Sequence, residues 1–276
     1  MKSVYECEII AQTEVAPGVI RCMLTGKEIA QQAKPGQFLN VRVSETTDPL
    51  LRRPFSIHST YPDEGIFSLL YVLVGRGTAI LYKRQNGEKI SVVGPLGSSF
   101  DYGDDPDAEH VIVAGGCGSA PLHFLCDGLC NKWGCESITV LSGAKSKDAL
   151  MCETEFRSHG VDVGISTDDG SYGHKGFVTE LLQKHLDSVK NPKKVRVYSC
   201  GPHQMMREVA RICKEAGVAK CQVSLENNMS CGTGVCLGCV QKIKGNFVGD
   251  TSGEGWHRER VCVEGPVFDA EAIIWD

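Results

Sequence analysis

The chain has 276 residues, of which 42% are hydrophobic and 23% are charged. This length suits two domains and a small appendage, and the composition is typical of a globular protein with a sizeable core. A formal net charge of −5 gives no reason to expect nucleic acid or an anionic membrane as a partner. Residues 1–10 lack the basic start and apolar stretch of a signal peptide, and no apolar run reaches membrane-spanning length, so we expect a cytoplasmic protein.

Residues 1–105 consist of short apolar runs separated by turn signals, and we assign them to one domain. The expected strands are Val4–Thr13, Val19–Leu24, Phe38–Val43, Ser56–His58, Phe67–Val74 and Lys89–Val93. The breaks between them come from Pro17-Gly18, Pro35-Gly36, Pro62-Asp63 and Asn86-Gly87. Several short strands at this spacing predict a small antiparallel β-barrel.

Two segments of this domain suggest chemistry as well as architecture. In Arg52-Arg53-Pro54-Phe55-Ser56, an arginine could pair with a pyrophosphate and the serine could hydrogen-bond a ring nitrogen, with Pro54 stiffening the spacing. Taken alone, this pattern also fits an exposed arginine at a strand start. In Gly75-Arg76-Gly77-Thr78, amides at a helix start could cradle phosphate oxygens, although an ordinary strand–turn–helix corner has the same sequence.

In combination, the R-P-x-S and G-x-G-T segments resemble the flavin-binding barrel of the ferredoxin reductase superfamily. The resemblance implies that Arg53 and Thr78, accompanied by Gly77, hold the pyrophosphate of FAD, and that Ser56 lies near flavin N5. The remaining flavin contacts that it implies are Pro54, Phe55, Leu70, Tyr71 and Val72.

A second domain is expected over residues 106–224, after the acidic stretch Asp104–Asp107. Its apolar runs alternate with helical segments, which predicts a parallel sheet covered on both faces. The expected strands are His110–Ala114, Ser137–Leu141, Asp162–Ser166, Lys194–Ser199 and Cys221–Leu225. The expected helices are Ala120–Trp133, Ala149–Ser158, Gly176–Leu186 and Gln204–Ala216.

Nucleotide binding in this domain is suggested by two turns that follow strands. The first, with Gly115, Gly116 and Gly118, misses the strict G-x-G-x-x-G fingerprint and is weak evidence by itself. The second is Cys200-Gly201-Pro202, where a buried strand-end thiol is the competing interpretation of the cysteine. The ferredoxin reductase family carries G-G-x-G-x-A-P and C-G-P at these two places, which implies NAD(P) binding beside the flavin and Cys200 near the nicotinamide.

The choice between NAD and NADP rests on an absence. Thr167–Ser171 could contact a ribose or be a solvated loop. No arginine cluster lies there to bind a 2′-phosphate, so NAD is favoured over NADP. His123 is expected to be a packing residue, and no catalytic residue is predicted.

A third unit, residues 225–276, contains Cys231, Cys236, Cys239 and Cys262. The spacing C-x4-C-x2-C with a distant fourth cysteine is that of a plant-type [2Fe–2S] ligand set. Tetrahedral zinc is the alternative, but zinc loops usually pair two C-x2-C knuckles, and only one is present. The other ten cysteines of the chain's 14 are expected to be mostly buried hydrophobic residues and not disulfide partners.

The order of barrel, nucleotide domain and cysteine loop resembles the electron-transfer subunit family of NAD-dependent dihydroorotate dehydrogenases. The resemblance is carried by the motifs above, by Ser224-Leu225-Glu226 with Met229, and by Glu264-Gly265-Pro266-Val267-Phe268 after the last cysteine. It implies one FAD and one cluster per chain, NAD as exchangeable substrate, and an FMN-containing catalytic subunit as partner in a heterotetramer of two of each chain. Electrons would pass from FMN to cluster to FAD to NAD in pyrimidine synthesis.

Two departures and two alternatives accompany this resemblance. The polar insertion Gly245–Arg260 puts local partner contacts in doubt, and Cys117 stands where the family usually has glycine or an aliphatic residue. An NAD(P)H–ferredoxin or hydrogenase diaphorase subunit, built from the same modules, is the runner-up. A zinc-stabilised scaffold without activity is disfavoured, because structure alone does not require all three nucleotide and flavin motifs.

Overall fold

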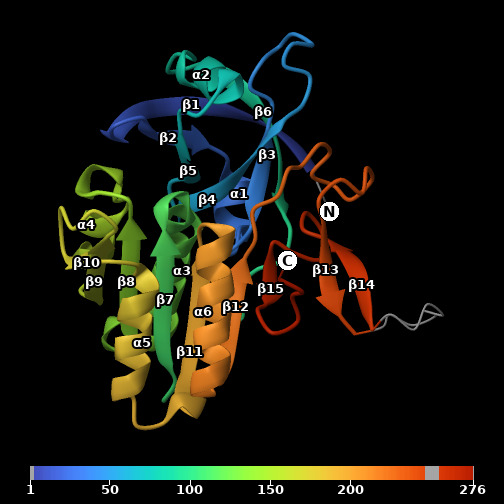
Figure 1. Ribbon diagram of the computed structural model, residues 1–276. Helices are drawn as coiled ribbons and strands as arrows, with labels where there is room; N and C mark the ends of the chain where they lie inside the picture. The colour runs from blue at the N-terminus through green and yellow to red at the C-terminus, as the bar shows by residue number, and fades with distance from the viewer. Residues whose placement is uncertain (1–2, 246–254, 276) are drawn as a thin grey trace.

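A computed structural model describes residues 3–245 and 255–275 of the chain. It contains a closed barrel, an α/β domain beside it, and a small C-terminal lobe (Figure 1). No helix within the described residues is long and apolar enough to cross a bilayer. The predicted fold class, a flavin-type barrel followed by a parallel-sheet domain, is confirmed.

The barrel is antiparallel and closes in the order β1-β2-β5-β4-β3-β6. Side chains alternate along its strands, as in β6, where every second residue is buried, because successive side chains of a strand point to opposite faces. The elements of this domain are β1 (Ser3–Ala16), β2 (Val19–Thr25), α1 (Lys27–Gln32), β3 (Phe38–Val41), β4 (Arg53–Tyr61), β5 (Ile66–Val72), α2 (Arg76–Tyr82) and β6 (Lys89–Leu96).

The α/β domain is built on a seven-stranded sheet in the order β10-β9-β8-β7-β11-β12-β15. All neighbouring pairs are parallel except the last, in which β15 runs antiparallel to β12. The strands are β7 (Glu109–Gly115), β8 (Ile138–Ala144), β9 (Asp162–Thr167), β10 (His174–Lys175), β11 (Val195–Cys200), β12 (Lys220–Ser224) and β15 (Val267–Asp269). The helices are α3 (Ser119–Trp133), α4 (Glu153–Ser158), α5 (Val178–Ser188) and α6 (His203–Ala216).

The helices cover the two faces of this sheet in pairs. In Figure 1, α5 and α6 lie in front of the sheet and α3 lies behind it. The apolar residues of α5 and α6 share one core with the front face, whereas those of α3 and α4 share a second core with the back face. Because α3 also packs against β4 of the barrel, it is the helix that joins the two domains.

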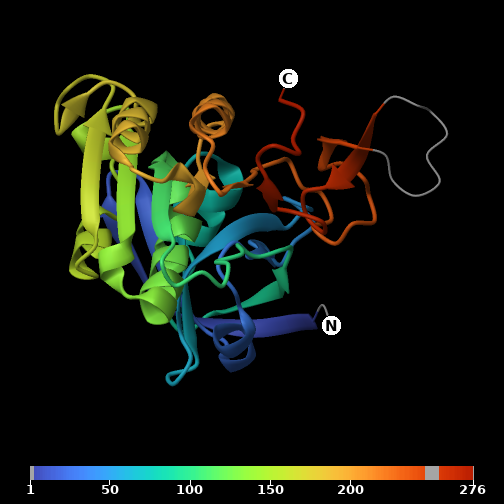
Figure 2. The same ribbon diagram turned by 90° about the horizontal axis from the view of Figure 1, so that it is seen from below.

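The C-terminal lobe is not separate from the sheet. It contains the antiparallel pair β13 (Val240–Lys244) and β14 (Trp256–Arg260), and its last strand, β15, completes the sheet at β12. Figure 2 shows this lobe beside the barrel. The predicted insertion Gly245–Arg260 contains the whole of β14; residues 246–254 of it lie outside the described part of the chain.

The observed elements differ from the expected ones in several places. β4 begins at Arg53 and not at Ser56, so the whole R-P-x-S segment lies on a strand. The short helix α1 was not predicted. α4 begins at Glu153 and not at 149, because Cys152 before it has a left-handed backbone (φ 60°) that a helix cannot continue. β10, β13, β14 and β15 were missed as well; β10 and β15, with two and three residues, are too short to show a periodicity of their own.

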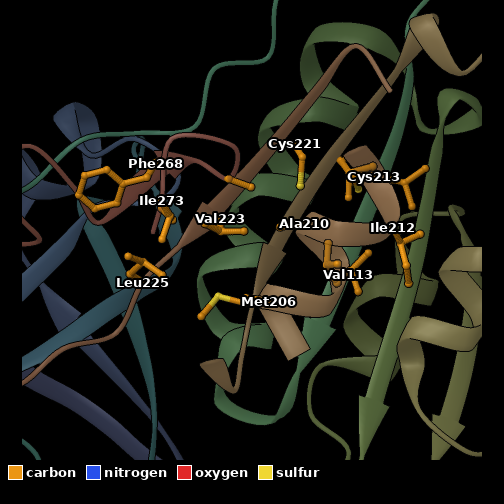
Figure 3. Close-up of a cluster of buried hydrophobic side chains, with 14 of the residues drawn as sticks. Val113, Met206, Ala210, Ile212, Cys213, Cys221, Val223, Leu225, Phe268 and Ile273 are labelled. Atoms are coloured by element: carbon orange, nitrogen blue, oxygen red, sulfur yellow. The ribbon is translucent and has the colours of Figure 1, made fainter. Parts of the chain in front are cut away.

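Figure 3 shows the apolar core that joins the lobe to the sheet. Phe268 of β15 and Ile273 lie near Val223 of β12, across from the inner face of α6. Phe268 is 7% exposed and Ile273 is fully buried. The lobe is therefore held by the same core as the α/β domain.

We expect the Phe268→Ala variant to lose about 3–5 kcal/mol of unfolding free energy, since it leaves a cavity in this core. Urea unfolding of the cofactor-loaded chain, followed by circular dichroism, measures the loss. Phe177→Ala is the matched control: Phe177 is 64% exposed, and its replacement should change stability by less than about 0.5 kcal/mol. Equal effects of the two substitutions would contradict this account of the core.

Candidate functional site

A cavity of about 330 Å³ lies where the barrel, the glycine-rich turn after β7 and the segment after β12 meet. Every predicted flavin contact except Gly77 lines it: Arg53, Pro54, Phe55, Ser56, Leu70, Tyr71, Val72 and Thr78. The sequence motifs from β4, β5 and α2 therefore converge on one place, as neighbouring barrel strands require. Apolar walls with one guanidinium suit a flat ring system that carries phosphates.

The two arginines at the start of β4 have different roles. The Arg52 guanidinium donates to the Ser91 carbonyl oxygen at 2.7 Å and to the Ser91 hydroxyl at 2.9 Å, which ties β4 to β6. Arg53 donates to the Leu51 carbonyl oxygen at 2.6 Å and lines the cavity. Arg53 is thus the one placed to meet a bound anion.

Gly77 is required by the position of Arg53. A Cβ atom built on Gly77 would lie 2.7 Å from Arg53 Nε, inside van der Waals contact. The Thr78 hydroxyl accepts hydrogen bonds from the amides of Val74 and Gly75 at 3.1 and 3.3 Å and donates to the Gly75 carbonyl at 3.0 Å. The threonine therefore fixes the turn that holds Gly77 against the arginine.

The two predicted nucleotide turns are packed against each other, backbone to backbone. β7 and β11 are parallel neighbours, with Ala114 opposite Cys200. A Cβ atom on Gly118 would lie 2.1 Å from the Cys200 carbonyl oxygen, and one on Gly201 would lie 3.0 Å from Gly115 Cα. These glycines permit the close approach, at the carboxyl ends of the strands where α/β domains bind ligands.

The cysteines near these turns are placed differently. Cys200 is 1% exposed, and burial raises the pKa of its thiol well above the ordinary value. Cys200 does not line the cavity, which agrees with the competing interpretation of it as a buried thiol at the end of a strand. Cys117, which departs from the family pattern, is exposed and does line the cavity, and Gly116 beside it has open space around it. Pro202 begins α6 as its N-cap residue.

The cysteine loop is shaped to stabilise a thiolate. Cys231 Sγ accepts hydrogen bonds from the backbone amides of Thr233 at 3.4 Å and Cys236 at 3.5 Å. Burial raises the pKa of this thiol, but those amides outweigh burial and lower the pKa to about 5. Amides directed at a cysteine sulfur are the second-sphere feature expected of an iron–sulfur site.

The four cysteines form two pairs. The Cys231 side chain contacts that of Cys236, and the Cys262 side chain contacts that of Cys239. Burial, and then the contact with Cys239, raises the pKa of Cys262 to about 12. Two pairs correspond to the two irons of a [2Fe–2S] cluster, each with two thiolates.

A single zinc ion fits this arrangement less well. Tetrahedral zinc with Zn–S bonds of about 2.3 Å would bring all four sulfurs to about 3.8 Å from one another. Within the described residues, however, no three of these four sulfurs all lie within 4.8 Å of one another. The geometry therefore favours the larger cluster.

Asn40 of β3, which sequence reasoning missed, positions the cysteine loop on the barrel. Its side-chain amide donates to the Cys231 carbonyl oxygen at 3.0 Å, and it is 1% exposed. Gly232 has φ +68°, and a Cβ there would lie 2.5 Å from Asn40 Nδ2, so this contact needs glycine. A lone asparagine in a strand carries no signal that could have revealed this role.

Glu226, Asn227 and Met229 were also missed as cavity residues. They follow β12 and precede the cysteine loop, so one continuous segment passes from the cavity to Cys231. Glu226 is accessible to solvent, and partial desolvation by the surrounding walls raises the pKa of its carboxyl. The run Ser224–Met229 was distinctive in sequence, but nothing in its pattern indicated which side chains face a ligand.

Comparison with known proteins agrees with this geometry. Residues 226–274 match the family model described as the iron–sulfur cluster binding domain of dihydroorotate dehydrogenase B, and residues 112–211 match an oxidoreductase NAD-binding domain. The chain is 40% identical to the dihydroorotate dehydrogenase B (NAD(+)) electron transfer subunit of Desulforamulus reducens, with 100% of each chain covered. It belongs to this family of electron transfer subunits.

Other members and a solved structure extend the match. The corresponding subunit of Bacillus mycoides is 36% identical, with 96% of each chain covered. A solved NADH-dependent reduced ferredoxin–NADP oxidoreductase, studied for flavin-based electron bifurcation, is 30% identical with a TM-score of 0.81. That alignment covers 100% of this chain and 92% of the other. The family resemblance read from the motifs is thereby confirmed.

We expect Arg53→Ala to weaken FAD binding about ten- to hundredfold, because a charge-assisted hydrogen bond contributes about 1.5–3 kcal/mol. Fluorescence titration of flavin-depleted protein with FAD measures the change. Arg211→Ala is the control: Arg211 lies on the exposed side of α6, where it donates to Glu208 at 3.0 Å, and its loss should leave FAD affinity unchanged. Unaltered binding in the Arg53 variant would remove this residue from the site.

Proposed function

We propose that this chain carries electrons from the FMN of a dihydroorotate dehydrogenase catalytic subunit to NAD+, by way of one [2Fe–2S] cluster and one FAD. The observation that carries the proposal is the continuous segment from Ser224 to Cys239, which lines the cavity and then forms the cysteine loop. Family membership supports the same conclusion, as does the order of the matched domains along the chain.

The flavin site would use the cavity walls and Arg53. Bound FAD supplies the one chemistry that links hydride exchange to single-electron transfer. Arg53 would neutralise the pyrophosphate, and Ser56, also on β4, would lie against the ring. Phe55 and Tyr71, whose ring centroids lie 5.4 Å apart, stiffen the apolar wall.

The cluster would be held by Cys231 with Cys236 and by Cys239 with Cys262. The amides of Thr233 and Cys236 would stabilise negative charge at the Cys231 sulfur. Cys239 and Cys262 are buried, whereas Cys236 is exposed. One pair therefore faces the protein interior, and the other lies at the surface.

The partner would dock at this surface. Val235 and Leu237, on either side of Cys236, are 82% and 61% exposed. Large apolar side chains exposed next to a redox group are typical of a protein interface. We assign this loop tip to the contact with the FMN-containing subunit, in a heterotetramer of two of each chain, within de novo pyrimidine synthesis.

Nicotinamide binding is assigned to the packed turns of β7 and β11, with Gly115, Gly118 and Gly201 allowing close approach of a pyrophosphate. We favour NAD over NADP, as the names of the curated relatives do. All 14 cysteines lie in the described part of the chain and each is a free thiol, seven of the ten outside the cluster set being buried. Free thiols in this number support a reducing, cytoplasmic location.

A diaphorase-type subunit with another partner is the second candidate. It is supported by the likeness to the NADH-dependent ferredoxin–NADP oxidoreductase, which covers the whole chain at 30% identity. The higher identity to the dihydroorotate dehydrogenase subunits favours the first candidate.

The identity of the partner protein distinguishes these two candidate functions. We expect the isolated chain, loaded with FAD, to oxidise NADH with an artificial acceptor and to leave dihydroorotate unchanged, because no orotate site or catalytic base is recognisable. The native complex, purified through a tag on this chain, should contain an FMN protein and reduce NAD+ with dihydroorotate. Turnover of dihydroorotate by the homogeneous chain, or a complex inert toward it, would overturn the proposal.

Replacement of one cysteine should separate the two redox sites. We expect Cys236→Ala to lose the cluster or bind it weakly, since one iron lacks a ligand, and electron transfer to the partner should fail. NADH oxidation with a dye that accepts electrons from FAD should largely survive. Iron and sulfide content, together with electron paramagnetic resonance of anaerobically purified protein, measures the cluster.

Cys213→Ala is the matched control, because Cys213 lies on α6 in the apolar core and is 1% exposed. Its iron content should equal that of the unmodified protein, with only packing lost. Zinc in place of iron in the unmodified protein, or full iron retention in Cys236→Ala, would refute the ligand assignment.

A further inference from the structure

Where α3 and α4 meet the barrel, metal-ligating side chains gather that have no part in the proposed electron path. Two groups there have three ligand atoms within 4.8 Å of one another. One consists of His123, Asp127 and His159, and the other of His58, Cys152 and Glu155. None of the first three residues lines the flavin cavity.

His123 is held in the tautomer that a metal requires. Its Nδ1 lies 3.2 Å from the backbone carbonyl oxygen of His58, which can only accept, so this contact favours the tautomer with hydrogen on Nδ1. The Ser59 hydroxyl, 3.0 Å from the same nitrogen, lies on this side of the ring too. In that tautomer the lone pair is on Nε2, and a metal-binding histidine usually donates its other N–H to a carbonyl in this way.

The second imidazole faces that lone pair. His159 Nε2 lies 3.4 Å from His123 Nε2. Tetrahedral zinc with Zn–N bonds of about 2.0–2.1 Å separates two nitrogen ligands by about 3.3–3.4 Å. The two ring nitrogens thus already stand at the spacing of neighbouring zinc ligands.

Asp127 supplies the third ligand and the negative charge. It lies four residues after His123 on α3, so both side chains are on one face of the helix. Its Oδ1 atom lies 2.7 Å from His159 Nε2, a hydrogen-bond distance, so the ion would replace this contact with one bond to each group, and its Oδ2 atom lies 3.9 Å from His123 Nδ1. The side chain of His123 is 9% exposed, whereas those of His159 and Asp127 are 26% and 24% exposed, which leaves an open side for water as fourth ligand.

We propose that His123, Asp127 and His159 bind a divalent transition metal, best fitted by zinc, at the joint between the barrel and the α/β domain. The ion would link α3 to the end of α4, while the His123 hydrogen bond to the His58 carbonyl connects it to β4. The site has a structural role, as a clamp that holds α4 and the barrel against α3.

The neighbouring group is the weaker candidate. Glu155, its carboxylate, already forms an ion pair with Arg21 at 3.3 Å, and that guanidinium would repel a second cation. Its ring, His58, stacks on His123 with centroids 4.5 Å apart and so supports the first site from behind. Substitutions in the two groups can therefore distinguish them.

The test uses the full chain with FAD and cluster in place, freed of loose metal with a weak chelator and titrated with Zn²⁺ in a calorimeter. We expect one zinc per chain, and a rise in melting temperature with zinc. We expect His159→Ala and Asp127→Asn, which keeps the shape of the side chain, each to weaken zinc binding by at least about a hundredfold. Loss of a residue that only hydrogen-bonds a ligand would weaken it less. Both substitutions should abolish the rise in melting temperature.

His174→Ala is the matched control, because His174 lies 2.8 Å from Glu180 as a surface histidine–carboxylate pair. It should bind zinc as the unmodified chain does, and Cys152→Ser should as well. Absence of stoichiometric zinc binding, or binding retained in His159→Ala and lost in Cys152→Ser, would overturn the proposal. Unchanged FAD absorbance in each variant establishes that the fold has survived the substitution.

Discussion

The hydrogen bond from the buried Asn40 amide to the Cys231 carbonyl oxygen joins the barrel to the cysteine loop, and the candidate redox sites depend on this contact. Electron transfer needs cofactors close together and held at a constant separation. Here the loop is fixed to β3 by Asn40, and the lobe that carries it is fixed to the sheet by β15. A cluster bound there would therefore be held on the same rigid body as the cavity proposed for FAD.

The nucleotide side of the cavity is held by a different kind of contact. Gly118 meets the Cys200 carbonyl without a Cβ between them, so the turns after β7 and β11 become one surface. α3 starts from the first of these turns and packs against β4 of the barrel. The proposed metal site lies on the same helix. The helix that presents the nucleotide turn is thus also the one that sets the position of the barrel.

Much of this architecture could be predicted from local patterns. The six barrel strands, the four main helices and five of the six parallel strands of the second domain follow from periodicity and turn residues, because these depend on neighbours in sequence. Family motifs added the predicted flavin contacts, and all of them except Gly77 line the cavity. α1, β10, β13, β14 and β15 were not predicted, since such short elements are stabilised by what they pack against.

By itself, the sequence determined the kinds of site: a cysteine spacing suited to a two-iron cluster, an arginine on a strand, and glycines where backbones must approach. These are properties of residue type and spacing, which local chemistry limits closely. Only the tertiary structure decided which groups meet: that Asn40 bonds the cysteine loop, that Glu226 lines the cavity, and that His123 faces His159. Such contacts join residues that are far apart in sequence or indistinguishable by type, and they arise only when the packed domains fix each side chain's direction.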